Sequence, residues 1–326
     1  MAAPVPILID TDIGDDIDDA LAIAFALRSP EVDVVGITTV FQRAALRARL
    51  ARHLCAAYGR SDVPVVGGLD RPLLGIVRPD WSPNQASVLE GDGPAAPPGG
   101  AERARAVDFI IAQGLRREGL VLVPIGAMTN VAVALAAEPA LAGRVRVVAM
   151  GGAWDRDSAE WNIACDPEAA AAVLASGVAV DFVGLDVTMG CRMRAPDMAA
   201  LSAAPASAPD ATLLAFLRAW QGASGGHDRA PILHDPLAVA AVFRPDLLGW
   251  EEGRVSVDLG AGGGGGSRRG ATRLTTVAGR DGEAGHRVAR RVDADGFLAL
   301  FGERVCRGPS ASPGAAAGGP PGAGSL

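Results

Sequence analysis

Short apolar runs alternate along the chain with longer stretches in which Ala and Leu recur at helical spacing. This alternation predicts an α/β fold with a largely parallel sheet flanked by helices. The predicted strands cover residues 7–9, 32–40, 63–66, 120–125, 145–150, 179–185, 254–259, 271–277 and 288–292. The predicted helices cover residues 18–27, 44–58, 104–117, 130–137, 167–176, 213–221, 236–243 and 294–305.

Segments rich in Pro and Gly interrupt this alternation at three places. Residues 71–100 form a long excursion, and loops of that length in compact domains often carry function. The glycine-rich residues 260–266 lie between two predicted strands and read as a hairpin connection. The chain after residue 306 is built from Pro, Gly, Ala and Ser and is expected to be disordered. We therefore predict one domain over residues 1–306 and a disordered tail over residues 307–326.

Six carboxylates lie within ten residues directly after the first predicted strand, at Asp10, Asp12, Asp15, Asp16, Asp18 and Asp19. Like charges packed this closely repel one another, and a folded chain tolerates them mainly when a cation neutralises them. Hard oxygen ligands of this kind suit calcium or magnesium. An EF-hand is excluded, because the twelfth position counted from Asp10 is Leu21 instead of glutamate.

Polar segments also follow several of the other predicted strands. In open α/β sheets, ligands bind beyond the carboxyl ends of the strands. The segments after the strands therefore meet at one edge of the sheet, and their carboxylates, amides and hydroxyls predict a binding cleft there. These segments are residues 10–19, 41–43, 126–130, 154–166 and 186–188.

The charge balance narrows the choice of partner. The formal net charge of −7, with no basic face evident, argues against a nucleic-acid polymer and favours a small or cation-bridged ligand. All 30 basic Lys+Arg positions are arginine, which excludes a P-loop lysine and a Schiff-base lysine. Only four histidines are available for acid–base chemistry.

The cysteine pattern and the apolar runs indicate the compartment. The four cysteines form no C-x-x-C pair, which favours free buried thiols in a reducing environment. Asp10 interrupts the first apolar run too early for a secretory signal, and no run approaches the roughly 20 residues needed to cross a bilayer. We expect a cytoplasmic protein without a membrane segment.

Seven sequence segments, taken together and in order, resemble the inosine-uridine nucleoside hydrolase family. They are residues 10–14 with 18–20, 37–40, 125–132, 150–152, 160–169, 183–188 and 234–236, within a resemblance that spans residues 6–305. The resemblance implies a nucleoside-hydrolase-like fold with a Rossmann-like core. It also implies calcium-dependent cleavage of the N-glycosidic bond of a small-molecule ribonucleoside, by a homodimer or homotetramer.

The resemblance also assigns roles by position to residues of this chain. Calcium ligands would be Asp12, Asp19, Asp235 and the main-chain carbonyl of Thr129. Asp12 would in addition accept a proton from the attacking water, and His234 would protonate the leaving base.

Further positions would contact the substrate. By the same resemblance, Asp18, Glu160 and Asn162 would hydrogen-bond the ribose hydroxyls. Met150 and Trp161 are further candidate substrate contacts, with Trp161 either stacking on the base or packing in the core.

The chain departs from the family pattern in its first two loops. Residues 15–17 replace a single residue of many members, and Asp15 and Asp16 could either join the metal or cap the following helix. Gln42 and Arg43 stand where members commonly carry Gly-Asn, which removes an amide expected to reach the sugar.

Two alternative functions remain open at this point. The altered Gln42-Arg43 pair favours a catalytically weak nucleoside-binding protein that retains the calcium site. The Asp10-x-Asp12 pair also resembles haloacid-dehalogenase-like phosphatases, although no lysine is present. In the Gly/Ser-rich residues 222–229, His227 and Arg229 either face the base or belong to an ordinary surface loop.

Overall fold

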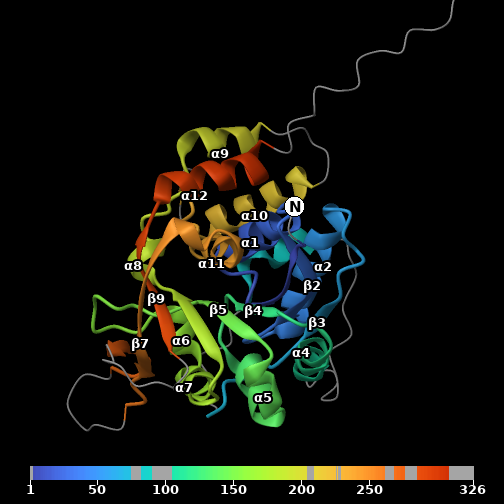
Figure 1. The fold of residues 1–326 in the computed structure, drawn as a ribbon. Coiled ribbons are helices and arrows are strands. Elements are labelled where there is room, and N and C mark those ends of the chain that lie inside the picture. The colour runs from blue at the N-terminus through green and yellow to red at the C-terminus, as the bar shows by residue number, and fades with distance from the viewer. Residues whose placement is uncertain are drawn as a thin grey trace, which may run out of the picture.

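The described strands of the protein form one mixed sheet, and several of its strands are labelled in Figure 1. The computed structural model describes residues 3–74, 82–89, 105–203, 209–224, 226, 229–260, 268–275 and 285–307. Within these residues the sheet has nine strands in the order β3-β2-β1-β4-β5-β6-β9-β7-β8. The strands are β1 (Val5–Thr11), β2 (Val32–Thr39), β3 (Val65–Gly67), β4 (Val121–Pro124), β5 (Arg146–Met150), β6 (Ala179–Val183), β7 (Leu248–Val257), β8 (Thr272–Thr275) and β9 (His286–Val292).

Helices follow most of the strands. The longer ones are α1 (Asp18–Leu27), α2 (Ala44–Ala57), α4 (Arg105–Arg116), α5 (Thr129–Ala137), α7 (Pro167–Ala175), α9 (Ala195–Ser202), α10 (Asp210–Ala223), α11 (His234–Phe243) and α12 (Ala294–Phe301). Short helical segments are α6 (Trp161–Cys165), α8 (Leu185–Thr188) and the turns η1 (Asn84–Leu89), η2 (Pro139–Gly143), η3 (Pro245–Leu247) and η4 (Gly302–Cys306).

The α/β fold with a largely parallel sheet is confirmed. Strands β1 to β6 run parallel to their neighbours and β9 runs parallel to β6, whereas β7 pairs antiparallel with both β9 and β8 at one edge. Each predicted strand and helix has an observed counterpart within a few residues. The prediction missed the short segments α6 and α8, the helix α9 and the first residues of β7. The predicted hairpin turn and the tail beyond residue 307 lie outside the described residues.

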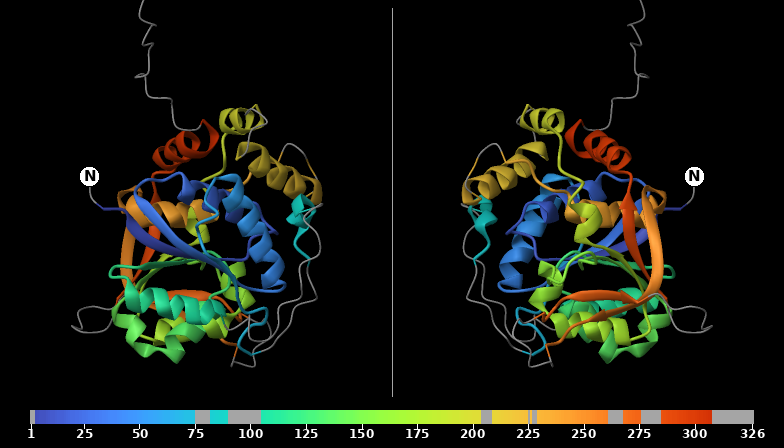
Figure 2. Two further views of the ribbon diagram at one scale, coloured as in Figure 1. Left: turned by 90° about the vertical axis from the view of Figure 1, so that its right-hand side faces the viewer. Right: turned by 90° about the vertical axis from the view of Figure 1, so that its left-hand side faces the viewer.

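Helices cover both faces of the sheet (Figures 1 and 2). Side chains alternate along a strand, so Ile7 and Ile9 of β1 face one apolar core and Leu8 faces the other. Helices α1, α2, α10, α11 and α12 contribute to the core with Ile7, and α4, α5 and α7 to the core with Leu8. Because both faces are covered, the central strands are apolar throughout instead of alternating with polar residues.

The strand order reverses direction at β1, which lies between β2 and β4. The chain leaves β1 toward the β3 edge of the sheet, and it leaves β4 in the opposite direction, toward β5. The loops after β1 and β4 therefore diverge, and a crevice lies between them. The loop after β1 is the carboxylate-rich segment 12–17, which leads directly into α1. The topology therefore places the acidic cluster at the position where ligands bind in folds of this kind.

The described residues contain no helix that is long and apolar enough to cross a membrane. All four cysteines are buried and carry free thiols, as the absence of a paired cysteine motif predicts.

Aromatic packing between helices gives a test of the fold. The ring of Phe25 on α1 is fully buried against Phe243 of α11 and against Phe297 and Phe301 of α12, at centroid distances of 5.9, 6.3 and 5.6 Å. Removing the ring leaves a cavity among three helices. We expect Phe25→Ala to lower the free energy of unfolding, measured by urea denaturation, by about 3–5 kcal/mol.

The matched control is Leu74→Ala, because the side chain of Leu74 is 66% exposed. We expect this variant to change the unfolding free energy by less than about 0.5 kcal/mol. A loss for Phe25→Ala as small as that for Leu74→Ala would contradict the packing described here.

Candidate active site

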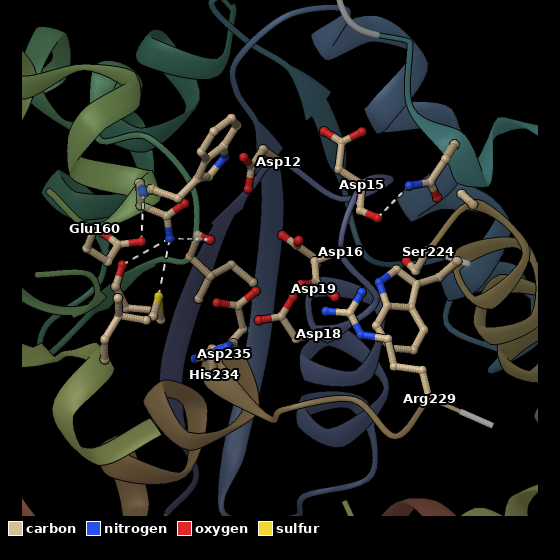
Figure 3. A pocket seen from close by; sticks show the side chains of 18 residues that line it. Asp12, Asp15, Asp16, Asp18, Asp19, Glu160, Ser224, Arg229, His234 and Asp235 are labelled. Atoms are coloured by element: carbon tan, nitrogen blue, oxygen red, sulfur yellow. Dashed lines mark hydrogen bonds between the residues drawn. The ribbon is translucent and has the colours of Figure 1, made fainter. Parts of the chain in front are cut away.

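A pocket of about 430 Å³ opens at the carboxyl ends of β1, β4 and β5 (Figure 3). Carboxylates make up most of its polar wall, together with amides, one histidine and one arginine. The lining residues are Asp12, Asp15, Asp16, Asp18, Asp19, Asn84, Ile125, Met150, Glu160, Trp161, Asn162, Leu185, Trp220, Ala223, Ser224, Arg229, His234 and Asp235. The predicted cleft at this edge of the sheet is therefore present.

Three carboxylates meet at the floor of the pocket. Asp18 and Asp19 belong to the first turn of α1, and Asp235 belongs to the first turn of α11. One oxygen of each lies within 4.8 Å of the others, and all three side chains are buried. Two helix N-termini thus point at one spot, where their unpaired N–H groups favour negative charge. This acidic trio is a candidate site for a divalent cation.

Burial and mutual repulsion oppose ionisation of the acidic trio. The pKa of Asp18, of Asp19 and of Asp235 is raised well above the ordinary value, first by loss of solvent and then by the neighbouring carboxylates. A buried carboxylate must therefore either hold a proton or face a positive charge. Three carboxylate oxygens within 4.8 Å of one another suit a hard cation such as Ca²⁺, which accepts about 6–8 oxygen ligands.

Asp12 faces the same pocket from the end of β1. Its neighbour Thr11 donates a hydrogen bond of 2.5 Å from its hydroxyl to Asp19, which ties the end of β1 to the first turn of α1. Gly126 allows the close packing, because a Cβ there would lie 2.8 Å from the Asp12 Oδ1 atom. Burial raises the pKa of Asp12 to about 6, although the nearby Arg47 lowers it.

Glu160 is held in place by backbone N–H groups. Its carboxylate accepts hydrogen bonds from the N–H groups of Gly152, Asn162 and Ile163 at 3.2, 2.8 and 3.1 Å, and so caps the N-terminus of α6. Burial raises the pKa of Glu160 to about 7 against the effect of these donors. The side chain is rigid and lines the wall opposite Asp16 and Arg229 (Figure 3).

The Asn162 amide joins the ends of two strands. Its Nδ2 atom donates to the carbonyls of Ile125 after β4 and Met150 of β5, at 3.0 and 3.2 Å. Trp161, between Glu160 and Asn162, lines the pocket and is 49% exposed, so it does not belong to the core.

His234 lines the pocket beside Asp235. Its Nδ1 atom lies 2.7 Å from the hydroxyl oxygen of Thr188 on α8. Burial, together with the charge of Arg192, lowers the pKa of His234 to about 4. The ring is therefore neutral at pH 7, and its proton lies on Nε2 in the tautomer in which Thr188 donates to Nδ1.

Thr129 is the one predicted site residue that the structure does not bring to this pocket. It begins α5, and its hydroxyl donates a 2.7 Å hydrogen bond to Asp166, whereas the ligand role of its main-chain carbonyl stays a prediction. Ile125, the first residue of the loop between β4 and α5, lines the pocket. Asp166 also accepts a hydrogen bond from the N–H of Ala169 and so caps the N-terminus of α7.

Sequence reasoning missed several residues of the far end of the pocket. Asn84 lies on η1, inside the predicted excursion, and Trp220 and Ser224 lie at the end of α10. Arg229, left open by the sequence, lines the pocket with its guanidinium 5.1 Å from the centre of the Trp220 ring. No motif marks these residues, because they reach the pocket only through the packing of α10 and η1. His227 lies outside the described residues.

Comparisons with known proteins agree with the geometry of the site. The family model described as inosine-uridine preferring nucleoside hydrolase matches residues 7–299. The chain is 34% identical over 316 residues to the pyrimidine-specific ribonucleoside hydrolase RihA of Citrobacter koseri, covering 92% of this chain and 98% of the relative.

Solved structures show the same fold over nearly the whole chain. A plant nucleoside hydrolase, PpNRh1, superposes with a TM-score of 0.79 and 28% identity, covering 93% of this chain and 99% of the other. A purine-preferring ribonucleoside hydrolase from Gardnerella vaginalis superposes with a TM-score of 0.70 and 28% identity, covering 92% and 98%. The chain therefore belongs to the inosine-uridine preferring nucleoside hydrolase family.

Proposed function

We propose that this protein hydrolyses the N-glycosidic bond of ribonucleosides to a free base and ribose, with Ca²⁺ bound at the acidic trio. One observation carries the proposal: a single pocket combines the acidic trio with Asp12, Glu160 and Asn162. Family membership and the names of the similar proteins support hydrolysis of ribonucleosides.

The donor set supports a hard divalent cation. Asp18, Asp19 and Asp235 offer only oxygen ligands, and their raised pKa reflects charges that have no solvent to screen them. When bound, Ca²⁺ would supply the positive charge that holds two neighbouring sugar hydroxyls and lowers the pKa of a water. Asp12 is placed beside the trio as a further ligand.

Asp12 is our candidate for the general base. Its carboxylate lines the pocket next to the acidic trio, and its pKa, raised by burial to about 6, is close to neutral pH. A base of that strength is ionised at pH 7 and still able to accept a proton from the attacking water. Hydrolysis at the anomeric carbon then proceeds through an oxocarbenium-like transition state, as in glycosidases.

Glu160 and Asn162 are our candidates for holding the ribose. Their positions are fixed by backbone hydrogen bonds at the ends of β4 and β5, so they need little reorganisation when a sugar binds. Asp18 can take a sugar hydroxyl, a cation or both, because it belongs to the trio and lines the pocket. Trp161 and Met150 would complete this wall of the site.

His234 is our candidate for assisting departure of the base. Because its ring is neutral at pH 7, it would act by donating a hydrogen bond from Nε2–H to a nitrogen of the departing base, in the tautomer in which Thr188 donates to Nδ1.

The base preference, the oligomeric state and the cellular compartment are further parts of the proposal. The similar proteins are named pyrimidine-specific in one case and purine-preferring in another, so a panel of both base types is required. We propose a cytoplasmic homodimer or homotetramer, and the four free thiols support a reducing compartment. Membership of the nucleoside hydrolase family argues against a haloacid-dehalogenase-like phosphatase. An activity assay distinguishes a hydrolase from a protein that binds nucleosides without cleaving them.

The first prediction concerns activity on a panel of purine and pyrimidine ribonucleosides. We expect the wild-type protein with Ca²⁺ to release base and ribose. We expect Asp19→Asn to reduce kcat/KM by at least ~10³-fold, because the variant loses a buried charge of the cation site. The same variant should lose the rise in Tm that Ca²⁺ gives the wild type.

Asp33→Asn is the matched control, because Asp33 is exposed on β2. It should keep full activity and the full calcium-dependent rise in Tm. Nucleoside binding by the wild type without release of base would refute the hydrolase and favour the binding protein. Full activity of Asp19→Asn would refute the cation site.

The second prediction concerns pH and the protein without metal. Asp10 and Glu160 have pKa values raised by burial to about 7, and the pKa values of the acidic trio are also raised well above the ordinary value. The folded state therefore holds protons that the unfolded chain has already released. Stability without metal must fall as pH rises from about 5 to about 7, by up to about 1.4 kcal/mol per pH unit for each such group, and the contribution of Asp10 and Glu160 must level off above that range.

Thermal unfolding in a chelator across this range checks the prediction. Saturating Ca²⁺ should flatten the slope, because the cation replaces the protons, and the double variant Asp19→Asn/Asp235→Asn should flatten it without calcium. A Tm in chelator that rises with pH over this window would contradict the assignment.

The third prediction concerns His234. We expect His234→Ala to lower kcat by about 10²-fold for nucleosides with poor leaving groups, and to leave synthetic substrates with good leaving groups nearly unchanged. Thr188→Val should act in the same direction with a smaller effect, because it removes only the hydroxyl at Nδ1. The control His53→Ala lies outside the pocket. Equal losses for good and poor leaving groups would argue against a role for His234 in departure of the base.

A further inference from the structure

Arg47 on α2 is a fully buried arginine beside the candidate active site, although it does not line the pocket. Its Nη1 atom donates to the carbonyls of Asp12 and Ile13 in the loop after β1. Its Nη2 atom forms a 2.7 Å ion pair with the Asp15 carboxylate in the same loop. One guanidinium therefore holds three positions of the acidic loop at once.

The same guanidinium also holds the loop after β2. Its Nε atom donates to the carbonyls of Phe41 and Gln42 at 2.7 and 2.8 Å. Burying a guanidinium is unfavourable unless its donors are satisfied, and here backbone oxygens and one carboxylate satisfy them. The planar fork of arginine can donate in several directions at once, whereas the ammonium of lysine cannot span both loops.

The loop after β2 is strained in a way that Arg47 can offset. Phe41, Gln42 and Arg43 have φ angles of 63°, 25° and 56°, although none of them is glycine. Left-handed backbone costs an ordinary residue about 1–2 kcal/mol, and such conformations persist only where the surroundings hold them. The two carbonyls that this turn points inward are those that accept from Arg47.

The acidic loop is held from its other side by η1. The side chains of Asn84 and Gln85 donate to the carbonyls of Asp15 and Asp16 at 2.8 and 2.6 Å, and the Gln85 N–H donates to the carbonyl of Gly14. The extra residues of this loop are thus fixed between α2 and η1. Asp15 faces Arg47 and is not part of the acidic trio.

We propose that Arg47 is a positioning residue for the cation site, which clamps the Asp12–Asp16 loop and the Phe41–Arg43 turn so that Asp12 faces the acidic trio. The proposal rests on the cation site of the proposed function.

The decisive experiment is a calcium titration of the metal-free protein by calorimetry, with the calcium-dependent rise in Tm as the second readout. We expect Arg47→Met to weaken calcium binding by about 10–100-fold, as removal of outer-shell partners typically does. We expect Arg47→Lys to fall between Arg47→Met and the wild type, because it keeps the charge and loses the fork. Arg52→Met, which changes an exposed arginine of the same helix, should bind calcium like the wild type.

A role limited to general stability predicts a different result. Arg47→Met would then lower the Tm of the metal-free protein and leave the calcium affinity unchanged, which would overturn the proposal. If Arg47→Met does not fold, Arg47→Lys carries the test: an affinity loss of at least about 10-fold supports the clamp, and wild-type affinity overturns it.

Two further outcomes separate this proposal from the one on which it depends. Absence of calcium binding by the wild type would refute the cation site itself, whatever Arg47 does. Asp15→Asn removes the ion pair and leaves the backbone hydrogen bonds of Arg47, so we expect a loss smaller than that of Asp19→Asn. A loss of calcium affinity equal to that of Asp19→Asn would indicate that Asp15 is a direct calcium ligand. That result would overturn the interpretation that the Asp15 carboxylate serves to pair with Arg47.

Discussion

Repulsion among buried carboxylates is the constraint on which this site depends. Asp18, Asp19 and Asp235 are brought within 4.8 Å of one another with almost no exposure to solvent, and Asp12 lies beside them. In water these charges would be screened, but inside the protein their repulsion must be met by protons or by a cation. A fold that assembles such a cluster at the base of an open pocket is built to hold a positive charge there.

The fold also stabilises the acidic cluster and fixes the side chains around it. Two helices, α1 and α11, start at the acidic trio, so their N-termini lower the cost of concentrating negative charge. The reversal of strand order at β1 opens the space above them. On the opposite wall, Glu160 and Asn162 are fixed by the backbone at the ends of β4 and β5. The candidate cation and sugar contacts thus belong to helix N-termini and strand ends, which favours precise positioning.

The sequence predicted those parts of the site that follow directly from strand ends. Asp12, Asp19 and Asp235 each lie next to a predicted strand or at the start of a predicted helix. Glu160 and Asn162 belong to the polar segment 154–166 that follows a predicted strand, and the sheet brings all five together. The contributions of Asn84, Trp220 and Ser224 depend on how η1 and α10 pack across the pocket, and no local pattern encodes that packing. The role of Arg47 could not be predicted for the same reason. Its sequence context is that of an ordinary helical arginine, and it is buried only because two loops fold around it. Thr129 shows the converse, because position next to a strand did not bring it to the pocket.

The most direct test of the central claim is a crystal structure of the protein grown with saturating Ca²⁺ and ribose. The account predicts a calcium peak in anomalous difference density among Asp18, Asp19 and Asp235, with Asp12 beside it. It also predicts that two neighbouring hydroxyls of the sugar face the ion. Clear density for these side chains, turned apart and without a peak between them at saturating calcium, would contradict it.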